Sequence, residues 1–273
     1  MSEQFFPQLF QTSSEITPYL HGDIGEIGQE AIHIENDINP IIQGLYQQIS
    51  EAHPEAGKAY WLTRTWDLLC WQPVYVAFIS IYGYHTLPNI REIAQHLKPC
   101  FVSGYRFADE AHIHGEPEAL IKEAGRQIRE LFDFYQQEMS QWTRIRPGFT
   151  HQLMSDGIMA CLIRLQQRFP QMTNSTLQEH AVLWLSAMGL DVDNSRSLHE
   201  TESDQPLKLV RKSCCLVYKC EGRKLCADCP RLEKNRQLMS KKVLNQHLFN
   251  LCNSARFESE NKYHCTLLLT TKR

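Results

Sequence analysis

The feature that most constrains this chain is a group of cysteines near its C-terminal end. Two adjacent cysteines, Cys214 and Cys215, are followed after ten residues by Cys226 and Cys229, which are spaced as Cys-x-x-Cys. A glycine lies between the two pairs, where the chain must turn back. Four thiolates brought together in a short loop can bind a tetrahedral zinc ion or an iron–sulfur cluster. The first expectation is therefore a metal centre built from this loop.

The spacing of the cysteines helps to distinguish the two kinds of metal centre. Zinc sites of the ribbon type usually supply two separated pairs, each spaced as Cys-x-x-Cys. Here the first pair has no spacer, so its two side chains must diverge from neighbouring Cα atoms. That arrangement suits a cluster with two metal atoms better than a compact single-ion site. A structural zinc ion and a disulfide framework stay open as alternatives.

The Cys-Cys-x10-Cys-x2-Cys pattern resembles the C-terminal signature of the FhuF-like ferric siderophore reductases, and the resemblance is specific over residues 210–231. It implies a [2Fe-2S] cluster and the one-electron reduction of siderophore-bound Fe(III) to Fe(II), which releases the iron. It also implies four cluster ligands, namely Cys214, Cys215, Cys226 and Cys229. Cys220 lies inside the same loop, and the sequence leaves open whether it can replace one of them.

The charge of the chain is divided unevenly, and the division falls just ahead of the cysteines. Residues 1–207 contain 13 Lys and Arg against 26 Asp and Glu, whereas residues 208–273 contain 15 against 5. A basic segment can bind nucleic acid. We favour another interpretation, in which no nucleic acid is a partner. The basic residues would offset a negatively charged cluster and favour its reduced state. The same surface could dock an acidic electron-transfer partner.

Helical periodicity dominates the chain ahead of the cysteines. Apolar residues recur at helical spacing in segments that begin near Pro117, Pro147 and Asn174, which predicts an antiparallel helical core. A helix is also expected to open at Asn39-Pro40, with Asn39 as its N-cap. Another is expected over residues 54–82, with a possible break at Gln72-Pro73.

Shorter segments predict a small sheet beside the helices. Residues 100–107 alternate as a strand would, and their partner is expected in residues 74–82 or 263–270. Residues 88–97 are expected to form a short helix. The glycines spaced along residues 22–28 predict a loop or a helix start, since their spacing differs from the dinucleotide fingerprint. The expected fold is mainly α (α+β), a bundle-like helical core with a small β-sheet and a C-terminal cysteine-rich iron–sulfur loop.

The polar residues 190–207 are interpreted as a linker. They would divide a mainly helical siderophore-binding region, residues 1–207, from a C-terminal [2Fe-2S]-binding segment, residues 208–273. A last amphipathic helix is expected over residues 230–249.

The reductase interpretation requires a pocket rather than a nucleophile or an acid–base pair. We expect this pocket between the helical region and the cysteine loop. The candidates for lining it, for each of which a structural or solvated role is the alternative, are Arg64, Arg106, His112, His114, Arg211 and Lys212.

The chain shows no nicotinamide or flavin fingerprint, so an external electron donor is expected, such as a ferredoxin, a flavodoxin or a flavin reductase. Ten cysteines without a recognisable export signal favour a cytoplasmic location. The apolar residues 66–82 are too short and too interrupted for a membrane span. Two other functions stay open: a zinc-stabilised interaction or nucleic-acid-binding protein, and an iron–sulfur redox sensor.

Overall fold

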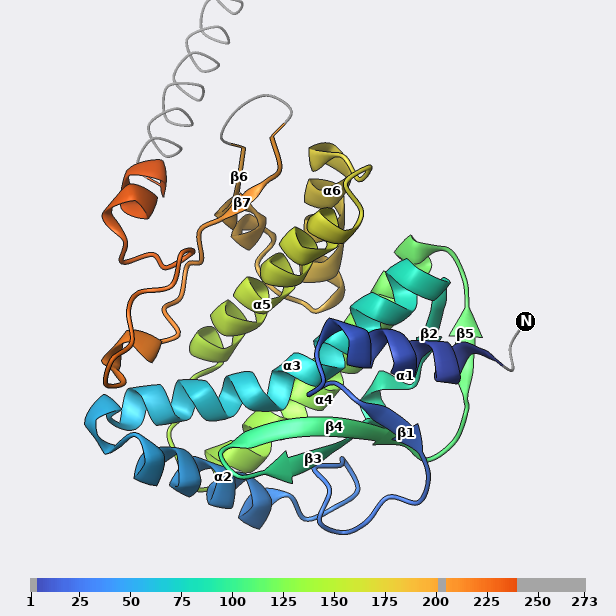
Figure 1. The fold of residues 1–273 in the computed structure, drawn as a ribbon, viewed down its shortest axis with the longest axis horizontal. Helices are drawn as coiled ribbons and strands as arrows, with labels where there is room; N and C mark the ends of the chain where they lie inside the picture. Colours follow the sequence, from blue (N-terminus) through green and yellow to red (C-terminus); the bar gives the residue numbers. More distant parts are fainter. Residues whose placement is uncertain (1–3, 201–204, 240–273) are drawn as a thin grey trace, which may run out of the picture.

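The computed structural model describes residues 4–200 and 205–239, and its architecture is the expected mainly helical α+β fold (Figure 1). The labelled α-helices are α1 (Phe5–Ile16), α2 (Asn39–Ala52), α3 (Lys58–Tyr84), α4 (Pro117–Ser140), α5 (Pro147–Arg168) and α6 (Asn174–Ala187). Helices α4, α5 and α6 confirm the three segments predicted from periodicity. Helix α1 was not predicted, because its sequence is mixed in character.

Helix α3 is the element around which the other helices pack. It contacts α1, α2, α4 and α5, and apolar side chains surround it on most sides. Trp66 is only 1% exposed, and its ring meets that of Phe132 on α4 at a centroid distance of 6.1 Å. A helix buried on several sides needs apolar residues around its whole circumference, which explains the density of large side chains in this segment.

Helix α3 continues through Pro73, so the predicted break is wrong. A proline inside a helix has no N–H, and it leaves the carbonyl four residues earlier without its usual partner. Here that carbonyl belongs to Leu69, and it accepts a hydrogen bond from the Nε2 of Gln95 at 2.8 Å. A side chain from the neighbouring sheet therefore replaces the missing helical hydrogen bond.

A three-stranded sheet lies beside α3, in the order β1-β4-β3. Strand β4 (Phe101–Phe107) confirms the predicted strand; β1 (Gly22–Ile24) pairs with it in parallel and β3 (Ala94–Lys98) in antiparallel. Three expectations are thereby corrected, since residues 22–24 are a strand, residues 94–98 are a strand, and residues 74–82 belong to α3. The other proposed partner, residues 263–270, lies outside the described residues.

The glycine at the start of β1 has a packing role. A Cβ atom at Gly22 would lie 2.5 Å from the side chains of both Phe10 and Tyr105. Any larger residue would push β1 away from α1 and β4. A glycine is therefore needed at this position, because the backbone lies close to the rings of Phe10 and Tyr105.

Two smaller sheets complete the fold. Strands β2 (Thr86–Pro88) and β5 (His112–His114) pair in antiparallel, as do β6 (Leu198–His199) and β7 (Lys208–Leu209). The 3-10 helices are η2 (Pro54–Ala56), η3 (Ile90–Glu92), η4 (Val192–Ser197) and η5 (Val217–Lys219). The predicted linker is thus more ordered than expected, because η4 and β6 occupy part of it.

Residues 210–239, which follow β7, lie along one side of the helical region (Figure 1). Residues 233–239 are helical, and the remainder of the helix expected over residues 230–249 lies outside the described residues. In the part of the chain that the structure describes, no helix has both the length and the apolar character needed to cross a membrane.

Candidate metal centre

The cysteine segment, residues 205–239, is seated on the helical region through polar contacts with α5. Asp156 of α5 is only 4% exposed, and its carboxylate accepts hydrogen bonds from the backbone N–H groups of Lys212 at 2.9 Å and Ser213 at 2.8 Å. The Ser213 hydroxyl donates to the same carboxylate. Burial raises the pKa of Asp156, while these donors favour its ionised form. One buried carboxylate therefore positions the chain immediately before the first cysteine.

A second polar anchor holds the segment after the last cysteine. Asn235 is fully buried, and its side-chain amide donates to the backbone carbonyls of Ala227 at 3.0 Å and Cys229 at 2.8 Å. The N–H of Cys229 in turn donates to the carbonyl of Cys226 at 3.1 Å, which closes the Cys-x-x-Cys turn. The two ends of the loop are thus fixed by residues on either side of the motif.

The four motif cysteines converge in two pairs. The Sγ atoms of Cys214 and Cys229 are 3.7 Å apart, and those of Cys215 and Cys226 are 3.4 Å apart. Two thiolates on one tetrahedral metal atom, with bonds of about 2.3 Å, lie about 3.8 Å apart. Each pair takes one cysteine from each half of the motif, because the adjacent side chains of the first half diverge. The donor set therefore fits a centre with two metal atoms.

Without a metal ion two of the four thiols, those of Cys226 and Cys229, resist ionisation. Burial, together with the neighbouring Cys215, raises the pKa of Cys226 to about 11. Burial also raises the pKa of Cys229, and the nearby Cys214 adds to the effect. Such groups become thiolates when a metal displaces their protons, so metal binding here is coupled to proton release.

Arg211 supplies positive charge beside the sulfur atoms. Its Nη2 lies 3.6 Å from the Sγ of Cys215, and its Nε lies 2.9 Å from a carboxylate oxygen of Asp228. Burial opposes the charge of this guanidinium, but Asp228 and Cys215 outweigh that effect and raise the pKa of Arg211. The arginine therefore stays charged and can donate a hydrogen bond to a thiolate sulfur.

Residues 211–231 match the family model described as the FhuF 2Fe-2S C-terminal domain. The chain carries an FhuF-type [2Fe-2S] domain. The matched residues include both sulfur pairs and Arg211, and the helical region lies outside the match. No solved structure matches the chain.

The cofactor of the FhuF-type domain is a [2Fe-2S] cluster, as the motif predicted. The two-metal geometry of the sulfur pairs is consistent with it. A single structural zinc ion, which the spacing had left open, would require all four sulfurs around one atom.

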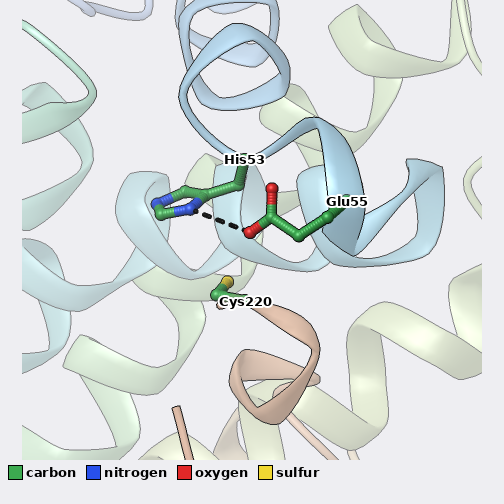
Figure 2. Close-up of side chains that lie close together, drawn as sticks. All are labelled: His53, Glu55 and Cys220. Atoms are coloured by element: carbon green, nitrogen blue, oxygen red, sulfur yellow. Dashed lines mark ion pairs between the residues drawn. The ribbon is translucent and has the colours of Figure 1, made fainter. Parts of the chain in front are cut away.

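Cys220, whose role the sequence left open, takes part in neither sulfur pair of the FhuF-type domain. It is 4% exposed and faces the helical region, where the side chains of His53 and Glu55 lie next to it (Figure 2). Cys220 is therefore an additional cysteine of this chain, outside the four that make up the motif.

The structure brings three of the six predicted pocket residues to the FhuF-type domain. Arg211 and Lys212 belong to it, and the Lys212 ammonium donates to the Asn194 side chain at 2.7 Å. Arg64 of α3 and Arg211 both lie close enough to Asp67 to favour the ionised form of its carboxyl. The Arg64 guanidinium also lies 5.6 Å from the centre of the Phe101 ring.

The other three predicted residues lie at the sheets. Arg106 on β4 forms a two-point ion pair with Asp23, with distances of 2.6 and 2.7 Å. His112 and His114 are on β5, and His114 is hydrogen-bonded to the Thr86 hydroxyl at 2.8 Å. Figure 1 shows β5 on the opposite side of the molecule from the cysteine segment.

The sequence reasoning missed the two anchors, Asp156 and Asn235, and a separate cavity. The cavity has a volume of about 330 Å³ and is lined mainly by rings and aliphatic side chains, with Arg164 and Arg168 among them. It runs along the second halves of α3 and α5 and the end of α1, whereas the cysteine loop is anchored at Asp156, in the first half of α5. A polar residue inside an amphipathic helix gives no local signal for an anchor, because its partners are distant in the chain.

Proposed function

We propose that this protein is a ferric siderophore reductase, which transfers one electron to a siderophore-bound Fe(III) ion. The observation that carries the proposal is the match to the FhuF 2Fe-2S domain at residues 211–231, combined with the two sulfur pairs inside it. The family supports a redox role in general, and the specific acceptor is our inference.

The four motif cysteines are the proposed ligands. Cys214 and Cys229 would hold one iron atom, and Cys215 and Cys226 the other, because these are the pairs whose sulfurs approach each other. When bound, the cluster supplies a one-electron carrier. Arg211 would keep a hydrogen bond on the Cys215 sulfur and so favour the more negatively charged, reduced state.

Reduction of the acceptor explains iron release without destruction of the chelator. Siderophores hold Fe(III) through hard oxygen donors, and Fe(II) is a softer ion of lower charge that prefers nitrogen and sulfur donors. One electron therefore lowers the affinity of the chelator for its iron. The protein needs to bring the chelate close and to orient it, and no acid–base residue is required.

We propose that the chelate approaches the protein on the side where α3 meets the cysteine segment. Arg211 lies 3.6 Å from the sulfur of Cys215, Lys212 follows it in the chain, and Arg64 of α3 lies close enough to Asp67 to act on its carboxyl, as Arg211 does. Cations in this position would attract a chelate with anionic oxygen donors. Arg106, His112 and His114 lie at the sheets, so we place them outside this surface.

The electron donor is proposed to be a separate protein, a ferredoxin, a flavodoxin or a flavin reductase. Basic side chains are exposed on the cysteine segment at Lys219, Arg223 and Lys224, and an acidic donor would complement them. Electron transfer from such a donor should then slow as the salt concentration rises, which stopped-flow measurement would detect. Salt-independent transfer would contradict the docking of an acidic partner here.

The proposed function also implies that the protein acts in the cytoplasm.

An anaerobic single-turnover experiment tests the function. The purified protein is reduced with dithionite, the excess is removed, and a ferric siderophore is added with a dye that traps Fe(II). We expect the visible spectrum to return to that of the oxidised cluster, with one Fe(II)–dye complex formed in the end for each cluster oxidised. A cluster that stays reduced would rule out this reaction and favour a redox sensor.

A further inference from the structure

Cys220 belongs to a second group of potential metal ligands, which the [2Fe-2S] domain does not use. Its thiol, the imidazole of His53 and the carboxylate of Glu55 each offer one ligand atom, and all three atoms lie within 4.8 Å of one another (Figure 2). His53 and Glu55 come from the turn between α2 and α3, and Cys220 comes from the cysteine loop. The group therefore spans the junction between the two parts of the molecule.

Two hydrogen bonds hold the turn that carries His53 and Glu55 in place. The carbonyl of His53 accepts a hydrogen bond from the indole N–H of Trp61 at 2.8 Å. One carboxylate oxygen of Glu55 accepts from the backbone N–H of Glu221 at 3.0 Å, which ties the turn directly to the residue after Cys220. The Glu55 carboxylate and the backbone that carries His53 are thus fixed before an ion binds, which lowers the conformational entropy that binding costs.

The group is also accessible from solvent on one side. The side chains of His53 and Glu55 are 42% and 39% exposed, whereas Cys220 is buried at 4%. Behind the thiol lies the hydroxyl of Tyr60, which hydrogen-bonds to it; burial and this contact raise the pKa of Tyr60 to about 12. An ion could thus enter past the imidazole and the carboxylate and reach the sulfur.

The donor chemistry selects a class of ion. One thiolate, one imidazole and one carboxylate suit divalent first-row transition metals, whereas Mg²⁺ and Ca²⁺ prefer oxygen donors alone. Three donors on one such ion lie about 3–4 Å apart. The present spacing within 4.8 Å needs only small side-chain rotations to reach that geometry. The thiolate and carboxylate together would balance the charge of the ion, and water could fill the remaining positions.

We propose that His53, Glu55 and Cys220 form a binding site for a divalent transition-metal ion at the junction of α3 and the cysteine loop. We assign its physiological ion as the Fe(II) that leaves the reduced chelate, and this assignment rests on the proposed function. Binding exchanges the oxygen donors of the chelate or water for the three side chains, and the proton of the Cys220 thiol passes to solvent. The site would keep Fe(II) from returning to the chelator.

The first test uses Zn²⁺, which has no redox chemistry. The intact cluster-containing protein is dialysed anaerobically against ZnCl₂, and zinc, iron and sulfide are counted per chain. We expect one zinc ion per chain beyond an unchanged cluster, and at least tenfold weaker zinc binding in Cys220→Ser, His53→Gln and Glu55→Gln. Cys100→Ser and Glu51→Gln serve as matched controls, because they alter a half-buried thiol and an exposed carboxylate outside the group.

X-ray absorption at the zinc edge identifies the ligands. One sulfur with nitrogen and oxygen neighbours is the expected first shell. A four-sulfur shell with loss of iron would show that zinc had entered the cluster site, and it would overturn the proposal. Zinc binding that is equal in wild type and in all three site variants would overturn it as well.

The assignment of Fe(II) is tested in the single-turnover experiment. Wild type should deliver Fe(II) to the trapping dye with a lag behind cluster reoxidation, and Cys220→Ser should shorten that lag. Cluster reoxidation is recorded in the same trace, so a failure of siderophore reduction is distinguishable from a failure of Fe(II) capture. Zinc binding without a lag in wild type would retain the metal site and reject Fe(II) as its ion.

Discussion

The helical region and the cysteine segment are stabilised in different ways. Around α3 the side chains are large, apolar and almost fully buried, and rings such as Phe78 and Trp184 stack with centroids 4.7 Å apart. In residues 210–239, the part of the chain after β7 that the structure describes, regular structure is sparse, and the main contacts are hydrogen bonds and ion pairs to Asp156, Asp228 and Asn235.

This difference predicts that the two regions respond to different changes. Burial of apolar surface contributes most of the stability of a region such as the helical core. A short loop with few apolar residues cannot offset its own conformational entropy in that way, and metal binding commonly supplies the difference. Loss of the cluster should therefore loosen the segment and leave the helices folded.

The largest expected effect follows from removing one cluster ligand. Cys215→Ser should abolish the iron–sulfur spectrum, because serine cannot replace the thiolate paired with Cys226. The circular dichroism of the helices should stay close to that of wild type. Cys100→Ser is the control and should keep the full cluster. A collapse of helical signal in Cys215→Ser would show that the two regions are not separable.

The second prediction concerns a substitution that weakens the helical core and leaves the cysteine segment unaltered. Trp66→Ala should lower the free energy of unfolding by about 3–5 kcal/mol, because it leaves a large cavity against Phe132. The melting of the helical signal measures this loss. Below the transition, the variant should still bind its cluster. Val182→Ala, at a position 44% exposed, should change the melting temperature little.

A smaller effect is expected at the contact between the regions. Asp156→Ala leaves the N–H groups of Lys212 and Ser213 without their acceptor, and an unpaired buried group costs about 1–3 kcal/mol. Hydrogen exchange at these two amides should accelerate, and a chelator should extract iron faster. Asp133→Asn, at an exposed position on α4, is the control. Unchanged exchange at residues 212 and 213 would contradict the anchoring role of Asp156.

The smallest expected effect concerns pH. Burial raises the pKa of Asp67 from its usual value near 3.8 to about 6. The folded protein therefore holds a proton that the unfolded chain has released, so this group contributes stability below about pH 4, and the contribution is lost as the pH rises through 6. At pH 7 Asp67→Asn should therefore be more stable than wild type, because the amide carries no charge that burial would destabilise.

The measurement is the difference in melting temperature between wild type and Asp67→Asn from pH 4 to pH 8. The difference should grow with pH and level off above pH 7. A difference that does not depend on pH would mean that Arg64 and Arg211 keep the Asp67 carboxylate ionised throughout, and the two regions would then be joined by a stronger ionic contact than burial suggests.

The sequence by itself determined the nature of the metal centre and most of the helices. Thiolate chemistry and the spacing of four cysteines predict a metal-binding loop, and the resemblance of that spacing to the FhuF signature implies a [2Fe-2S] cluster. Both depend on residues close together in the chain. Helices α4 to α6 were equally predictable, since a repeating apolar face is a local pattern. The strand β4 followed from alternation for the same reason.

Only the tertiary structure decided which distant residues meet. Gln95 replaces the hydrogen bond that Pro73 removes, and Asp156 holds the backbone of Ser213. Cys220 faces His53 and not the sulfur pairs, although its position in the loop allowed either. Such contacts join residues separated by tens of positions, so no local pattern encodes them; they follow from the way in which the buried surfaces of α3 and α5 bring the chain together.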